Sequence, residues 1–495
     1  MEKGKYNILN FKLYYIIQGK KLSREKSLIK NTVIITIGRI CTQLISFLLL
    51  PLYTTLLSTE EYGIVDLLNT LTSLCLPIIT FQIEQALFRK LVDNRNNQDE
   101  IKNTISTTIF TVLGQIIIYI GLFFMIAPLI HNDYKYFLIT NVIACIFSSI
   151  MLQISRGLGD NRKYAEGSFI TALVTVLLNL VFIAYFKLGA YGMLAATLFG
   201  NILCCIYVFF TKKIYKYISI KAFNKKLLKS LWKYSFPLIP NAISWWIFNS
   251  SDRIIVSSIL GVSENGILSA AYKFSSVYIT IYNIFNMTWT ESASLHINDK
   301  DCNEFFSKII NTALKLFTSI CLGIIAFMPF IFPIMINDKF SKAYNQIPIL
   351  MLSSLFNVVV GLISVIYIAK KDTKAVAKTS VFAAIINLLV NLSLVNAIGL
   401  YAASISTLVA YFVMSMYRLY DVKKYIRVKL DRCFVISTFI IIITLLFTYY
   451  VNNIFLNICM MVIICIYALI FNKESIGSIF FMLKSKFLKK GVKNV

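Results

Sequence analysis

The sequence is poor in charged residues and in histidine, and it has no nucleotide-binding motif. Only 15% of its 495 residues are charged, whereas a soluble globular protein carries roughly a quarter. Its only two histidines, His131 and His296, exclude a multi-histidine metal centre. No GxxxxGK[ST] segment occurs, so we expect no ATP hydrolysis by this chain. These absences argue against a soluble globular protein and against an ATP-driven pump.

The cysteine pattern gives no sign of a disulfide framework or a metal site. The ten cysteines are scattered, no CxxC pair occurs, and most of them fall inside long apolar runs. Structural zinc sites and disulfide scaffolds need regular spacings that are missing here. Residues 1–29 lack the clean hydrophobic core of a cleavable signal peptide. We therefore predict no metal, no cofactor and no catalytic residue.

Long apolar runs dominate what is present. Hydrophobic residues make up 58% of the chain, and the mean hydropathy is +0.72. From Phe434 to Phe447, for example, only one serine and two threonines interrupt the run. About 20 apolar residues span a bilayer as a helix, and lipid offers the backbone no other hydrogen-bond partners. Since the runs do not alternate in polarity as barrel strands do, the sequence predicts an all-α polytopic membrane protein.

The runs give about fourteen transmembrane helices. We predict them at 31–56, 63–88, 104–129, 136–155, 168–187, 190–210, 235–260, 266–290, 309–335, 346–369, 376–397, 400–418, 433–451 and 453–471.

Lysine and arginine are distributed unevenly between the breaks that separate these spans. Eight precede the first span, whereas the next break, 58–61, has none. Cytoplasmic breaks of membrane proteins carry the excess of basic residues. The even number of spans then predicts both termini in the cytoplasm, although the inner break at 291–308 is nearly charge-balanced. The predicted outer breaks contain only Lys135, Lys187, Lys339 and Lys342.

The formal net charge of +26 is explained by this topology, so no nucleic-acid partner is predicted. The abundance of Ile, Asn and Lys is typical of an AT-rich bacterial genome. We therefore predict a multi-pass protein of the bacterial cytoplasmic membrane.

Two pairs of similar segments indicate an internal repeat. Ser58–Ile64 is similar to Val262–Ile267, and Gly189–Met193 is similar to Gly399–Ala403. Six spans return the chain to its starting side, so each half is predicted as a six-helix bundle in the same orientation, a parallel repeat. The predicted domains are a basic N-terminal segment (1–30), a first bundle (31–210), a basic linker (211–234), a second bundle (235–420), two extra helices (421–471) and a basic tail (472–495).

The linker carries eight lysines and no acidic residue. We predict a basic amphipathic helix on the inner leaflet. Its lysines either set the topology alone or bind anionic lipid or a partner protein, and the sequence leaves both readings open.

Two stretches resemble the Wzx-type polysaccharide flippases of the MOP exporter superfamily. Asn31–Thr70 is similar to their opening helices, and Asn249–Ser275 is similar to the Asp-Arg and Tyr-Lys signature of their seventh and eighth helices. The resemblance extends from about Leu28 to Tyr420. It implies a flippase for an isoprenoid-pyrophosphate-linked oligosaccharide, with this anionic lipid-linked glycan, membrane lipids and other polysaccharide-assembly proteins as partners. Related proteins act on O-antigen, capsule or similar glycans.

Cations inside the predicted spans are the first candidates for a functional site. Arg39, Lys273 and Arg253 lie at membrane depth, where an ionisable residue is costly unless it has a partner or lines a wet cavity. Guanidinium and ammonium groups bind phosphate, so these three are candidates for a substrate cavity. The alternatives are an Arg39–Glu84 pair, snorkelling of Lys273, and a purely structural role for Arg253.

Four further ionisable residues are candidates for ion coupling or for pairing of helices: Asp66, Asp252, Glu84 and Lys315. Interface solvation is an alternative for Asp66 and Glu84, and inward snorkelling is one for Lys315.

Other functions stay open. A multidrug exporter or a lipid-II-type flippase would share the fold, and the basic mid-depth charges favour an anionic substrate over the organic cations of the former. A glycan polymerase or glycosyltransferase would need a long outer loop or a cytosolic domain, and no predicted outer break exceeds roughly a dozen residues. We therefore expect transport without covalent chemistry.

Overall fold

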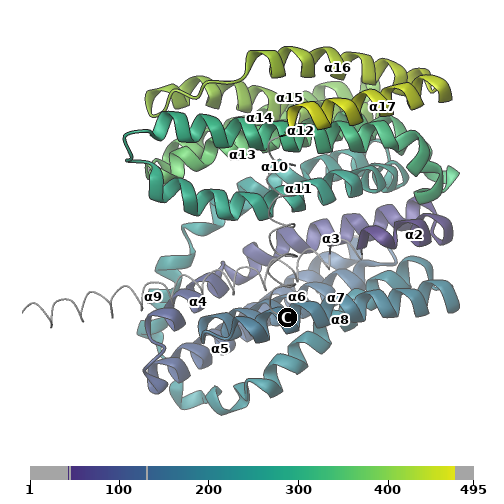
Figure 1. Cartoon of the computed structure of the whole chain (residues 1–495). Helices are drawn as coiled ribbons and strands as arrows, with labels where there is room; N and C mark the ends of the chain where they lie inside the picture. Colours follow the sequence, from purple (N-terminus) through teal and green to yellow (C-terminus); the bar gives the residue numbers. More distant parts are fainter. Residues whose placement is uncertain (1–42, 44–45, 130–131, 474–495) are drawn as a thin grey trace, which may run out of the picture. The chain divides into compact units, whose positions relative to one another are not determined.

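The computed structural model describes residue 43 and residues 46–129 and 132–473, which form helices joined by short turns (Figure 1). No strand occurs in those ranges. The chain divides into two compact units. Among the described residues, unit 1 comprises Cys75–Phe186 and Tyr191–Ile239, and unit 2 comprises Ser46–Leu74, Lys187–Ala190 and the chain from Pro240 onward. The division into bundles at 31–210 and 235–420 stays a prediction.

Eleven helices of the described residues are long and apolar enough to cross a membrane. The first predicted span is described only as the shorter apolar helix Ser46–Leu56. The spans predicted at 235–260 and 266–290 fall on α10 (Leu238–Ile259) and α11 (Val262–His296). These two helices are not among the eleven. All fourteen predicted spans lie on helical segments, the first one in part and the second one across a break between two helices.

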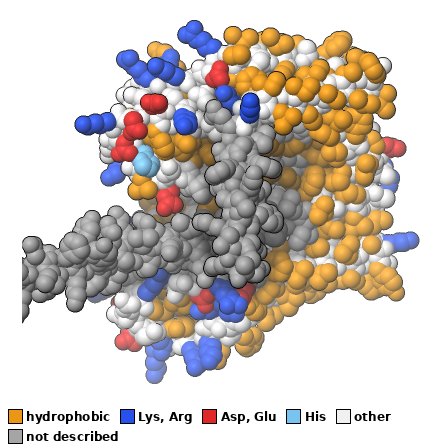
Figure 2. All heavy atoms as spheres, in the orientation of Figure 1, with side chains coloured by type: hydrophobic (Ala, Val, Ile, Leu, Met, Phe, Trp, Pro, Cys, Tyr) orange, Lys and Arg blue, Asp and Glu red, His pale blue; other side chains and the backbone are white. Residues whose placement is uncertain are grey.

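The outer surfaces of the last two helices are apolar. On α16 (Arg432–Val451) Phe439 is 65% exposed, and on α17 (Ile454–Phe471) Ile470 is 64% exposed. Figure 2 shows hydrophobic side chains over much of the upper part of the view, where these helices lie. Apolar patches of this extent are rare on soluble monomers and are typical of a surface covered by lipid.

Unit 1 contains the end of the second predicted span, most of the third to sixth spans and the linker. Its elements are α4 (Ile83–Asp93), α5 (Gln98–Ile126), η1 (Ala127–Leu129), α6 (Lys135–Gly157), α7 (Asn161–Asn179), η2 (Leu180–Tyr185), most of α8 (Gly189–Thr211), η3 (Ile214–Tyr217), η4 (Ile220–Ala222) and α9 (Lys225–Ser235).

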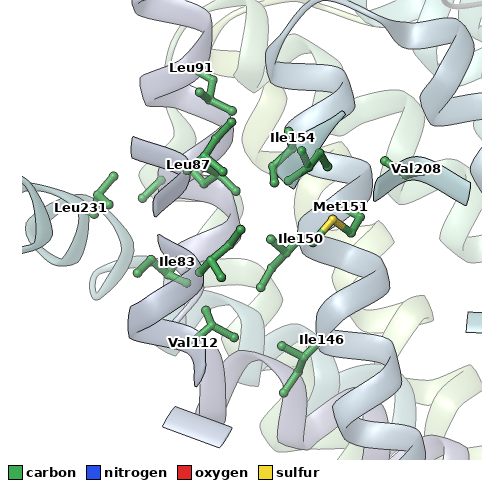
Figure 3. Packing of buried hydrophobic residues seen from close by; sticks show 14 of the residues in the cluster. Ile83, Leu87, Leu91, Val112, Ile146, Ile150, Met151, Ile154, Val208 and Leu231 are labelled. Carbon is green, nitrogen blue, oxygen red and sulfur yellow. The ribbon is translucent and has the colours of Figure 1, made fainter. Parts of the chain in front are cut away.

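The core of unit 1 forms where α4 packs on α6 (Figure 3). Ile83, Leu87 and Leu91 recur every four residues, so they share one face of α4. They meet Ile150 and Ile154 of α6, and all five side chains are at most 2% exposed. Helices α4 and α6 thus each present a stripe of apolar side chains, and burial of the two stripes against each other explains why the helices pack together.

The second predicted span, 63–88, is wrong in one respect, because the structure breaks it. Helix α3 ends at Thr80 after starting at Thr59, and α4 begins at Ile83. Between them, Phe81 and Gln82 both have left-handed backbone angles, with φ of 52° and 57°. This conformation costs residues other than glycine roughly 1–2 kcal/mol each. Local sequence gave no sign of the break, since neither residue is glycine or proline.

The basic linker folds partly as predicted. Helix α9 is amphipathic, but Leu227 and Leu231 on its apolar side are buried in the core of unit 1, and Figure 3 shows Leu231 pointing toward α4. Its four lysines remain exposed. The apolar face is therefore covered by protein, and only the basic face is free to meet charged groups.

Unit 2 contains the first part of α3 and all later transmembrane helices. Its other elements are α2 (Leu50–Leu56), α10, α11, α12 (Cys302–Met335), η5 (Asp338–Phe340), α13 (Ala343–Ala369), α14 (Thr373–Ile398), α15 (Tyr401–Asp421), η6 (Val422–Lys424), α16 and α17.

Two helices of unit 2 are longer than a bilayer requires. Helices α11 and α12 have 35 and 34 residues, which is about 50 Å at 1.5 Å per residue. The hydrocarbon core is about 30 Å thick. The predicted inner break at 291–308 is correspondingly too long, because α11 continues to His296 and α12 begins at Cys302.

The repeat is visible in the turns. Gly189 and Gly399 occupy equivalent positions in the two similar segments, and both have positive φ, 56° and 58°. Only glycine adopts this conformation without strain. A glycine with positive φ thus begins α8, and another lies just before α15.

Candidate functional site

A buried carboxylate joins three helices of unit 2. Asp252 of α10 is 2% exposed and accepts three hydrogen bonds. The donors are Asn391 Nδ2 of α14 at 2.8 Å, Thr407 Oγ1 of α15 at 2.7 Å and Tyr272 Oη of α11 at 3.1 Å. All three donors are neutral, and no lysine or arginine of the described chain forms an ion pair with Asp252.

The spacing of polar residues on α14 builds one side of this site. Asn387 and Asn391 are four residues apart, so they lie on the same face of the helix. Both are fully buried, and Asn387 Nδ2 donates to Thr407 Oγ1 at 3.3 Å. The side-chain oxygens of both asparagines lack a hydrogen-bond partner within the described ranges. Oxygens without a hydrogen-bond partner beside a buried carboxylate can accept a hydrogen bond from a proton donor or coordinate a hard cation.

Arg253, the next residue, faces another helix. Consecutive helical residues point about 100° apart, and Arg253 Nε lies 3.2 Å from Asp66 Oδ2 of α3. The contact is an ion pair and not an aligned hydrogen bond, because Nε itself has no hydrogen-bond acceptor in the described residues. The guanidinium also lies 5.3 Å from the centre of the Tyr272 ring. Asn265 Nδ2 donates to Asp66 from the other side at 3.4 Å.

Lys273 lies close to this pair. Its side chain is half-buried, and it interacts electrostatically with Asp66 and Arg253. No ion pair or hydrogen bond of its ammonium group occurs in the part of the chain that the structure describes. The cluster therefore brings together four of the predicted residues, Asp66, Asp252, Arg253 and Lys273, within unit 2.

Beside the cluster, α3 and α11 approach each other at two glycines. A Cβ on Gly63 would lie 2.9 Å from the Gly266 amide nitrogen, and a Cβ on Gly266 would lie equally close to the Gly63 nitrogen. One turn earlier, the hydroxyls of Thr59 and Ser263 are 2.6 Å apart. The two glycines hold the same position in the two similar segments, so the contact is symmetric about the repeat. Only glycine permits so close an approach of two helix backbones.

The other predicted residues lie elsewhere. Glu84 is in the first turn of α4 in unit 1, is 3% exposed, and its Oε2 has no hydrogen-bond partner among the described residues. Lys315 of α12 forms an ion pair with Asp431 at 2.8 Å and lies over the rings of Phe434 and Phe471, so it ties α12 to α16 and α17. Arg39 lies outside the described residues.

The largest buried cation was missed by sequence reasoning. Arg418 of α15 is 2% exposed, and its guanidinium donates to Ser364, Thr379 and Ser380 and to the Val376 carbonyl. All of these acceptors are neutral. It lies at the end of the predicted span at 400–418, and nothing in the local sequence singles it out. The hydroxyls that satisfy it come from α13 and α14, which local spacing does not reveal.

No group of three or more His, Cys, Asp or Glu side chains gathers in the described residues to hold a metal. The nine cysteines in these ranges are free. What the cluster offers chemically is a buried carboxylate surrounded by neutral oxygens and, beside it, a paired arginine and a lysine.

Comparison with known proteins identifies the family. The family model described as "Polysaccharide biosynthesis protein" matches residues 28–290, more than half of the chain. The chain belongs to this family. An uncharacterized membrane protein of Methanocaldococcus jannaschii is 25% identical over 439 residues, covering 81% of this chain and all of the relative.

The fold of this polysaccharide biosynthesis protein is that of the MOP exporters. A structure of the lipid II flippase MurJ in an inward closed conformation aligns with a TM-score of 0.66 and 18% identity, covering 91% of this chain and 99% of the other. An inward-facing MATE family multidrug transporter of the MOP superfamily aligns with a TM-score of 0.60 and 11% identity, covering 79% and 98%. The predicted membrane fold is confirmed.

We predict that Asp66 and Arg253 are energetically coupled. Asp66→Asn and Arg253→Gln each leave one partly buried charge without its partner, so each should destabilise the protein by about 2–4 kcal/mol. The double variant should lose less than the sum of the two. Denaturation of the purified protein in detergent measures this, with the exposed Asp133→Asn as the control. Strictly additive losses would contradict the pair.

Proposed function

We propose that this protein is a flippase that moves an isoprenoid-pyrophosphate-linked oligosaccharide from the inner to the outer leaflet by alternating access. The observation that carries the proposal is the ammonium group of Lys273, which has no bonded partner among the described residues and lies at the predicted membrane depth, in a member of the polysaccharide biosynthesis family. A lysine at membrane depth without a bonded partner in the described residues is costly unless it meets an anion or water. The pyrophosphate of such a substrate supplies the anion.

Arg253 contributes the second positive charge of this site. Its ion pair with Asp66 orients the guanidinium and leaves its remaining donors for a phosphate oxygen. Arg39, in the first half of the repeat, stays the predicted third cation of the cavity. The substrate lipid tail would remain in the bilayer while the head group occupies the cavity.

An anionic substrate fits this site better than an organic cation. A cavity for cations should present an accessible carboxylate, but Asp252 is almost fully buried under three hydrogen-bond donors, and Asp66 is paired with Arg253. A lipid-II-type substrate carries the same pyrophosphate and remains an alternative, as does a multidrug exporter. A glycan polymerase or glycosyltransferase is the more distant alternative.

We assign ion coupling to Asp252. A buried carboxylate that has neutral donors and uncommitted amide oxygens around it can take up a proton or a hard cation when substrate binding or conformation changes its surroundings. Glu84 is the corresponding candidate in unit 1. The proposed setting is the bacterial cytoplasmic membrane with both termini in the cytoplasm, and the other proposed partners are membrane lipids and polysaccharide-assembly proteins.

Deletion of the gene tests the flippase proposal. We expect lipid-linked oligosaccharide to accumulate inside the cell and surface glycan to fall, and wild-type protein to restore both. Lys273→Ala should reduce restoration at least tenfold at equal protein level, because the phosphate loses its ammonium partner. Lys374→Ala, an exposed lysine on α14, is the matched control. Unchanged surface glycan without any accumulated intermediate would contradict the substrate class, and drug-efflux assays would then be the next test.

Replacement of Asp252 tests the coupling role. Asp252→Asn keeps the size of the side chain but removes the charge, so we expect at least a tenfold loss of gradient-driven flipping in proteoliposomes. Imposed proton and sodium gradients, applied separately, identify the ion. Asp133→Asn should behave like wild type. A variant of Asp252 that is folded and still responds fully to both gradients would exclude this carboxylate.

A further inference from the structure

A cleft of about 430 Å³ opens at one end of unit 2, and its lining includes none of Asp66, Asp252, Arg253 and Lys273. It lies between three turns, those that join α10 to α11, α12 to α13 and α14 to α15. By the distribution of lysine and arginine, these turns are on the predicted outer side. We call it the turn cleft. Its volume is within the range of about 300–1,000 Å³ for sites of small molecules.

Polar groups without partners line the turn cleft. Gln346 is only 2% exposed, and its Oε1 accepts a hydrogen bond from Ser404 at 2.7 Å, while its amide nitrogen donates none within the described residues. The side-chain amide of Asn345 and the hydroxyl of Tyr401 are also uncommitted in that part of the chain. These three groups offer two amides and a phenol to a ligand.

The charges at the turn cleft cancel. Glu264 of α11 forms an ion pair with Lys342, which lies just before α13. The remaining lining is aliphatic and includes Leu260 and Leu400. A bound phosphate would meet the Glu264 carboxylate and no arginine, whereas an apolar ligand would leave the buried Gln346 amide without a partner.

We propose that the turn cleft binds one sugar unit of a glycan. A pyranose ring has hydroxyls that pair with amides and carboxylates, and its C–H faces pack on tyrosine and leucine side chains. The cleft offers both kinds of surface, with no net charge. This site lies apart from the proposed phosphate site, so it goes beyond the flippase proposal and would hold the glycan after it reaches the outer side.

Binding of free sugars to the full-length protein in nanodiscs tests the proposal. The probes are glucose, galactose, N-acetylglucosamine and, separately, inorganic phosphate, followed by saturation-transfer NMR. We expect at least one sugar to bind wild type, and Asn345→Ala and Tyr401→Ala to weaken that binding about threefold to tenfold. Asn396→Ala on α14 and Tyr417→Ala on α15, both exposed and outside the cleft, are the matched controls. Tyr401→Phe serves as a second variant if Tyr401→Ala lowers the thermal unfolding midpoint.

No sugar binding by folded wild-type protein would overturn the proposal. Sugar binding that the cleft variants leave unchanged, or binding of phosphate alone at the cleft, would also overturn it. Binding of free sugars is measured without any transport step. The result is therefore independent of whether the flippase test in cells succeeds or fails.

Discussion

The ion pair between Arg253 and Asp66 is the interaction on which the site in unit 2 depends. Arg253 lies six residues before the end of α10, inside the span predicted at 235–260, where an unpaired guanidinium would be very costly. Asp66 neutralises it from α3 at 3.2 Å. Arg253 thus pairs with Asp66, while Asp252 accepts hydrogen bonds from neutral donors of α11, α14 and α15. Two adjacent residues of α10 therefore have different proposed roles: Arg253 is a candidate to attract an anion, and Asp252 is a candidate for ion coupling.

The glycine contact between α3 and α11 lies beside this ion pair. Helices in lipid associate through close packing of small residues and through interhelical hydrogen bonds, since lipid provides little hydrophobic driving force. Gly63 and Gly266 supply the close packing, and Thr59, Ser263 and Asn265 supply the hydrogen bonds. In an alternating-access cycle, a contact made of small residues and a few polar bonds is one that can form and separate without exposing a large apolar surface.

Much of the fold could be predicted because it follows from local sequence. The long apolar runs are helical, although the run at 63–88 is divided between α3 and α4, and the similarity of the segments that begin at Gly189 and Gly399 was visible in the sequence. The break at Phe81–Gln82 could not be predicted, because neither residue is a glycine or proline that would mark a left-handed turn in the sequence. Asp252, Arg253 and Lys273 could be chosen as candidates from the sequence because ionisable residues are rare at the predicted membrane depth. Their partners Thr407 and Tyr272, and the neutral acceptors of Arg418, are ordinary residues that only the three-dimensional fold brings to them.

Cross-linking α3 to α11 tests the central claim most directly. Thr59→Cys and Ser263→Cys, in a protein without the ten native cysteines, replace two hydroxyls that are 2.6 Å apart. If transport requires this contact to open, oxidation should stop flipping of a lipid-linked oligosaccharide in proteoliposomes, and a reductant should restore it. Flipping by the single Thr59→Cys variant should respond neither to the oxidant nor to the reductant. Full flipping by the cross-linked protein would contradict alternating access through this contact.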